Sequence, residues 1–107
     1  SCFTAEVHVC YIDELKEGAP VRVTYQLLDW DAKRIQIFGH MYHAETGVLA
    51  ATSEQMCIHV DMASRRASPF PDDAQAKIAK LMDAHKSLAR PEQAGRVIGI
   101  KRKAAAE

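Results

Sequence analysis

Residues 43–61 read HAETGVLAATSEQMCIHVD, and this stretch carries the strongest structural signal in the chain. Its first residues, 44–47, are typical of a tight hairpin that a glycine closes. The pattern then predicts a last strand from about residue 48 to residue 60. Because side chains alternate along a strand, Glu54 should share one face with Thr52, Met56 and Ile58.

Three further strands are predicted upstream of this hairpin. Apolar and polar residues alternate over residues 3–11, over residues 21–29 and again from Ile35 through Met41. A turn at residues 16–20 and a break at residues 29–32 separate these runs. The sequence therefore predicts an antiparallel sheet of four strands. Chain order alone would pair strand 3–11 with strand 21–29.

One amphipathic helix is predicted after the sheet. Residues 69–71, Pro-Phe-Pro, end the sheet region, and Asp72 and Asp73 suit the first turn of a helix that Pro91 terminates. One face should carry Ala74, Ile78, Leu81, His85 and Leu88. The fold class is then α+β, in a single domain over residues 1–107. One helix of about four turns cannot cover a whole sheet face, so either another chain covers it or a covering helix is missing upstream.

Composition excludes several classes of protein. Lys plus Arg is 14 and Asp plus Glu is 14 in 107 residues, so no net charge draws the chain to nucleic acid. No apolar run is long enough to span a membrane, and no signal-peptide pattern is present. Three widely spaced cysteines argue against a disulfide framework and for a reducing compartment, here the cytoplasm.

Few residues are candidates for chemistry. His40 and His43 should point to opposite faces of one strand and cannot easily share a metal, so no metal site is expected. The sequence contains no glycine-rich phosphate loop, so no cofactor is expected either. Glu54, on a partly apolar face, is either a base or a solvated carboxylate. Arg65 and Arg66, with Ser64 beside them, form the one local basic cluster, which either binds phosphate or is a solvated charge pair.

Three segments resemble one family. Residues 43–56 followed by 59–61 resemble the final hairpin of hotdog-fold acyl-CoA thioesterases of the 4-hydroxybenzoyl-CoA thioesterase type. Residues 11–18, YIDELKEG, resemble the segment that joins that fold's second and third strands. Arg65-Arg66 and residues 69–71 resemble its exit loop. The resemblance covers about residues 3–100, and within the family the carnitine and betaine catabolism subgroup is the most similar.

The resemblance implies a hotdog-like sheet that lacks the family's N-terminal strand and central helix. Strand 3–11 should then lie beside strand 48–60, and two chains should pair through strand 3–11 as a homodimer, or a homotetramer. The family hydrolyses thioesters with a carboxylate as nucleophile or base and a backbone N–H that polarises the carbonyl. Its catalytic Asp has no counterpart here, so no catalytic residue is assigned, and this chain alone should hydrolyse acyl-CoA poorly.

Three functions therefore stay open at this point. The first is a thioesterase domain that acts on a small acyl-CoA, with Arg65, Arg66, Ser64 and Glu54 as candidate substrate-binding residues. The second is a non-catalytic hotdog module that binds acyl-CoA or holds two chains together. The third is a β-sheet interaction domain with no ligand. Acyl-CoA or CoA is the expected ligand of the thioesterase and of the acyl-CoA-binding module.

Overall fold

The computed structural model describes residues 1–102, so the last five residues of the predicted domain 1–107 lie outside it. Five strands form the sheet: β1 (Cys2–Tyr11), β2 (Val21–Trp30), β3 (Arg34–His43), β4 (Leu49–Asp61) and the two-residue β5 (Arg66–Ala67). One helix follows, α1 (Asp72–His85). Four predicted strands and the helix are present, whereas β5 was not predicted. The antiparallel sheet with one C-terminal helix confirms the predicted fold class.

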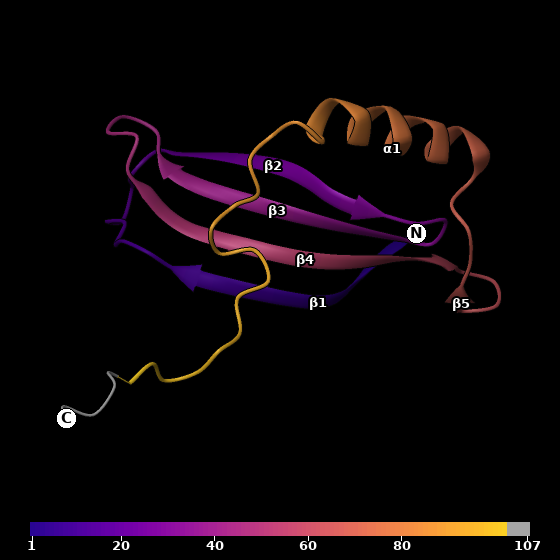
Figure 1. Cartoon of the computed structure of the whole chain (residues 1–107), viewed down its shortest axis with the longest axis horizontal. Helices are drawn as coiled ribbons and strands as arrows, with labels where there is room; N and C mark the ends of the chain where they lie inside the picture. The colour runs from indigo at the N-terminus through magenta and orange to yellow at the C-terminus, as the bar shows by residue number, and fades with distance from the viewer. Residues whose placement is uncertain (103–107) are drawn as a thin grey trace, which may run out of the picture.

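The strand order is β1-β4-β3-β2, with β5 pairing only with the end of β4 (Figure 1). β1 lies antiparallel to β4, with Cys2 opposite His59 and Tyr11 opposite Ala51. Residues 12–20 therefore cross from one edge of the sheet to the other, and β1 and β2 are not a hairpin. This confirms the pairing that the family resemblance implied. β1 and β2 are the two edge strands of the described chain.

The two faces of the sheet differ in chemistry. The pairing registers place polar or aromatic side chains on one face, called here the polar face: Glu6, His8, Gln26, Gln36, Phe38, His40 and Glu54. The opposite, apolar face carries mainly aliphatic and aromatic side chains: Val7, Val9, Tyr11, Val21, Val23, Tyr25, Ile35, Ile37 and Met41. Val7 and Tyr25 are each 58% exposed. The described residues thus leave much of the apolar face uncovered, as the sequence led us to expect.

Helix α1 packs along β2 and does not spread over the sheet (Figure 1). Its half-buried side includes Ala74, Ile78, Met82 and His85. The predicted face was partly wrong, because Leu81 is 46% exposed and Leu88 lies beyond the helix, 51% exposed. A helix that meets one edge strand buries only a narrow stripe, and Met82, four residues after Ile78, continues that stripe. At its end, His85 Nδ1 accepts the Leu27 backbone N–H at 3.0 Å.

The chain then crosses the polar face. In Figure 1 the segment after α1 runs in front of β3 and β4 toward β1. Gln26 Nε2 donates to the Ala89 carbonyl oxygen at 3.3 Å, and the Gly95 N–H donates to Glu54 Oε1 at 2.7 Å. Phe38, which is 1% exposed, is the most deeply buried large side chain on this face. The polar face is therefore partly covered by the chain itself.

Candidate functional site

The turn that follows β4 carries Ser64 and Arg65, and Arg66 begins β5 directly after it; residues 62–66 are called here the arginine turn. Asp61 builds this turn, since its carboxylate accepts the backbone N–H groups of Ala63 and Ser64, both at 3.3 Å, and its carbonyl accepts the Arg65 N–H at 2.7 Å. A hydrogen bond from the Ser64 side chain, with the two backbone N–H groups, lowers the pKa of Asp61. Arg65 has φ 59°, in the left-handed region that non-glycine residues rarely occupy. The turn is thus formed by local bonds that leave both guanidinium groups exposed.

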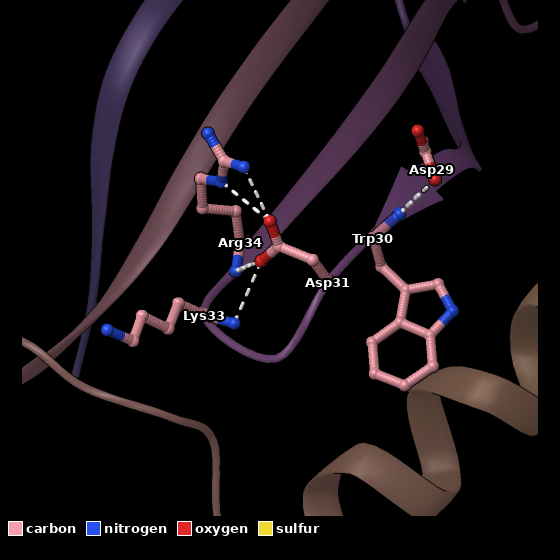
Figure 2. A network of polar contacts seen from close by, with 5 residues as sticks. All are labelled: Asp29, Trp30, Asp31, Lys33 and Arg34. Carbon is pink, nitrogen blue, oxygen red and sulfur yellow. Dashed lines mark hydrogen bonds and ion pairs between the residues drawn. The ribbon is translucent and has the colours of Figure 1, made fainter.

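A second charged turn joins β2 to β3 (Figure 2). Asp31 accepts Arg34 Nε at 2.8 Å and Arg34 Nη2 at 2.6 Å, and it also accepts the backbone N–H groups of Lys33 and Arg34. The hydrogen bonds from the Arg34 guanidinium lower the pKa of Asp31 to about 2, with the backbone bonds adding to the effect. Arg34 is therefore already neutralised by its own turn. The ammonium group of Lys33 makes no contact with Asp31 in this network.

These two turns meet at one end of the sheet. The His59 N–H donates to the Lys33 carbonyl at 2.7 Å, and the Phe70 N–H donates to the Ala32 carbonyl at 2.8 Å. A shallow groove of about 420 Å³ lies beside the β2–β3 turn, lined by Asp31, Ala32, Lys33, Arg34, Ile58 and Ala67. Lys33 was missed from the sequence, although a Lys-Arg pair beside Asp31 was visible there. Among the described residues, neither Lys33 nor the two exposed arginines is in an ion pair.

Glu54, the fourth predicted site residue, lies elsewhere. It is on the polar face, as its alternation predicted, and accepts Gln36 Nε2 at 2.7 Å and the Gly95 N–H at 2.7 Å. It stands seven positions before Asp61 in β4, which at roughly 3.3 Å per residue separates it from the arginine turn by about 23 Å. The structure therefore brings Ser64, Arg65 and Arg66 together and leaves Glu54 apart from them.

A larger, open cavity of about 610 Å³ lies at the other end of β1, where the chain leaves the sheet. It is lined by Tyr11, Ile12, Asp13, Glu14, Leu15, Met41, Ala50 and Ala51. The N–H groups of Ile12 and Asp13 both donate to the Ala50 carbonyl, at 2.8 and 3.0 Å, and this holds the segment against the sheet. Asp13 and Glu14 fall within residues 11–18, the segment that resembles the family's crossover, and were not among the candidate site residues.

The histidines do not gather. Burial lowers the pKa of His40, whose ring stacks on Tyr42 at a centroid distance of 5.9 Å and meets Phe38 at a tilt at 5.0 Å. His59 Nδ1 lies 2.9 Å from the Ser68 carbonyl oxygen. In residues 1–102, no three His, Cys, Asp or Glu side chains are arranged to hold a metal ion. Within the same residues, no helix is long and apolar enough to cross a membrane.

Comparison with known proteins decides the family. Residues 1–78 match the family described as the Thioesterase-like superfamily. The chain belongs to this superfamily. Betainyl-CoA thioesterase of Pseudomonas aeruginosa is 43% identical over 100 residues, which are 94% of this chain and 63% of that protein. The L-carnitine dehydrogenase/betainyl-CoA thioesterase of Rhizobium meliloti is 38% identical over 102 residues, 95% of this chain and 21% of that protein.

Solved structures agree with this assignment. A Staphylococcus aureus protein determined in complex with CoA superposes with a TM-score of 0.87 at 33% identity, over 94% of this chain and 63% of that protein. The family assignment and the hotdog-like fold that the resemblance implied are thereby confirmed. The chain spans less than two thirds of the length of these relatives.

Proposed function

We propose that this member of the thioesterase-like superfamily acts as an acyl-CoA thioesterase domain in the cytoplasm. The reaction is hydrolysis, in which water attacks the thioester carbonyl and the products are a carboxylic acid and free CoA thiol. The observation that carries the proposal is the 43% identity to a betainyl-CoA thioesterase across nearly the whole chain. The order β1-β4-β3-β2 supports it, because a sequence-adjacent pairing of β1 with β2 would not fit the related structures.

The relatives also indicate the acyl class. Five curated relatives match, and each name includes betainyl-CoA thioesterase. A betainyl group is a trimethylammonium bound through one methylene to the thioester carbonyl, so it is small and permanently cationic. We therefore take a small cationic acyl-CoA as the substrate of the domain.

The arginine turn is the proposed contact for the phosphates of CoA. CoA carries a pyrophosphate and a 3′-phosphate, and guanidinium groups bind such anions through paired hydrogen bonds. Arg65 and Arg66 are exposed and free of ion pairs within the described residues. Lys33 lines a groove that also includes Ala67, the residue after Arg66. The hydroxyl of Ser64 can add a donor. No described residue is assigned as the catalytic carboxylate.

A homodimer through β1 would complete this arrangement. β1 is an edge strand whose other side has no partner in the described chain, and β1 carries exposed apolar residues. Pairing with its own copy about a two-fold axis would make one continuous sheet. Because that pairing is antiparallel, the Tyr11 end of one chain would lie near the Cys2 end of the other. The Cys2 end lies close to the arginine turn of its own chain, since the N-terminus of Ser1 donates to the Val60 carbonyl.

The activity is tested by thiol release from betainyl-CoA with the full-length protein that carries these residues. The expected turnover is of order 1–1,000 per second. If no thioester is hydrolysed but CoA still binds in a calorimetric titration, the domain is a binding module and the catalytic proposal is wrong.

The phosphate contact has its own test. Arg65→Ala combined with Arg66→Ala should weaken CoA binding at least tenfold, or about 1.4 kcal/mol, and more strongly at low salt because exposed charges are screened. Lys77→Ala with Lys80→Ala is the matched control, since it removes two exposed cations from α1. Equal affinity of both double variants at low ionic strength would leave the arginines as a solvated pair.

A further inference from the structure

The cavity at the Tyr11 end of β1 combines three kinds of surface. Its floor is apolar, formed by Met41 and Ala51 of the apolar face. Its rim carries two adjacent carboxylates, Asp13 and Glu14. Its third component is the ring of Tyr11, which is 88% exposed within the described residues.

The carboxylates at this rim are available for a cation. Asp13 uses Oδ1 to accept the Glu14 N–H at 2.8 Å, which leaves its second oxygen free, and the Glu14 carboxylate makes no hydrogen bond within the described residues. Neither is in one of the described ion pairs. Lys16 lines the adjoining cavity of about 290 Å³ that shares both carboxylates. Two negative charges against one positive charge leave the rim acidic.

This combination suits a quaternary ammonium group. Such a cation has no N–H to donate, so it is recognised by the face of an aromatic ring and by carboxylates that approach without a hydrogen bond. Its methyl groups also need apolar surface, which the floor supplies. A neutral acyl group would gain free energy only from contact with the apolar floor. Its binding would also remove water from two carboxylates without supplying a positive charge in return.

We infer that Asp13, Glu14 and Tyr11 form the subsite that binds the cationic end of the acyl group and selects it over neutral acyl groups of the same shape. This inference rests on the proposed function. The backbone supports the assignment of a fixed site, because the two N–H bonds to the Ala50 carbonyl hold residues 12 and 13 against the sheet. The rim therefore has a defined position relative to the floor.

The test compares two thioesters of equal shape. Betainyl-CoA carries a trimethylammonium, and 3,3-dimethylbutanoyl-CoA carries a neutral tert-butyl group at the same position. The full-length protein should bind betainyl-CoA about tenfold more tightly, as cation–π and carboxylate contacts at an exposed site add up to this order. Asp13→Asn with Glu14→Gln should remove most of that preference, and Tyr11→Leu should reduce it about threefold.

Controls separate the subsite from the reaction. Glu45→Gln removes an exposed carboxylate of the β3–β4 turn that lines neither cavity, and it should leave the preference unchanged. Circular dichroism checks that each variant is folded. Binding of both thioesters is measured by calorimetry, and hydrolysis by thiol release.

A preference for betainyl-CoA without hydrolysis would overturn the proposed function and keep the subsite. Equal binding of the two thioesters, binding of neither, or a preference that survives the double variant would overturn the subsite.

Discussion

Replacing Glu54 should release the segment that follows α1 from the polar face of the sheet. Glu54 accepts two bonds of 2.7 Å, one from Gln36 on the neighbouring strand and one from the N–H of Gly95. A bond to a charged acceptor contributes roughly 1.5–3 kcal/mol. Gly95 is exposed, so its N–H can turn to water and the loss of free energy should fall in the lower part of that range or just below it. We expect Glu54→Ala to destabilise the attachment by about 1–2 kcal/mol.

Hydrogen exchange at single amides is the suitable assay. A loss of 1–2 kcal/mol corresponds to a roughly 5- to 30-fold change in an opening equilibrium, and the Gly95 amide should exchange faster by that factor. Amides in the middle of β3 and β4 should change little, because their ladder bonds remain. Glu54→Gln keeps one carbonyl oxygen and should fall between the wild type and the alanine variant.

Glu6→Ala provides the control, because Glu6 lines the same pocket as Glu54 and Gly95 on the polar face and its carboxylate makes no described hydrogen bond. Unchanged exchange at Gly95 in Glu54→Ala would refute the anchoring role. Weaker thioester binding in Glu54→Gln, with Gly95 unaffected, would instead assign the residue to substrate binding, as the sequence first indicated.

Three further outcomes follow from described contacts. Arg34 lowers the pKa of Asp31 to about 2, so the contribution of Asp31 to stability is present above the ordinary carboxylate pKa of about 4 and is lost as pH falls toward 2. In Asp31→Asn this part of the acid sensitivity should be absent when the free energy of unfolding is measured against pH. His85→Ala should lower the free energy of unfolding by about 1–3 kcal/mol in denaturant, because the N–H of the buried Leu27 loses its acceptor. His85→Asn, with an oxygen near the Nδ1 position, should recover part of this loss, whereas full stability of His85→Ala would contradict the role. Val7→Lys places a charge on the edge strand β1 and should shift a dimer toward monomer in sedimentation velocity; a dimer of unchanged affinity would exclude β1 as the seam.

Periodicity predicted where the strands are but not which strands pair. β1 and β2 follow each other in sequence and both alternate, so nothing in their residues excluded a hairpin between them. The resemblance of residues 11–18 to a crossover segment supplied the pairing of β1 with β4, and the register confirms it. β5 escaped prediction because a two-residue ladder has no period to detect.

Only the part of the candidate site that is formed by residues close together in sequence could be predicted. Arg65 and Arg66 are adjacent in sequence, and the turn that presents them is built by Asp61, four residues earlier. The Gly95 N–H, in contrast, is 41 residues from Glu54. Spacing along the chain could not show that a carboxylate on the polar face would anchor this distant segment. Long-range contacts of this kind need the fold first.

The cavity at Tyr11 illustrates the same limit. Its floor comes from β3 and β4 and its rim from the crossover that follows β1. Seen in the sequence, Asp13 and Glu14 were ordinary polar residues at a strand end. Only the position of the crossover over Met41 and Ala51 gives them an apolar neighbour and hence a possible ligand.

The proposed sites for phosphate and for the acyl group stand at opposite ends of β1. Its ten residues span roughly 33 Å at about 3.3 Å per residue. Antiparallel pairing of two β1 strands removes this separation, because it sets the Tyr11 end of one chain against the arginine end of the other. One thioester would then be bound by both chains, with its phosphates on one and its cationic acyl group on the other.

This arrangement makes a prediction that a site within one chain does not. Subunits with Arg65→Ala and Arg66→Ala should be mixed with subunits that carry Asp13→Asn and Glu14→Gln. Each homodimer has two damaged sites, but a mixed dimer has one site with both intact clusters and one with neither. Isolated mixed dimers should therefore bind betainyl-CoA at one site per dimer with wild-type affinity. If both clusters of a site belonged to the same chain, every site of the mixed dimer would be damaged and no tight binding would return.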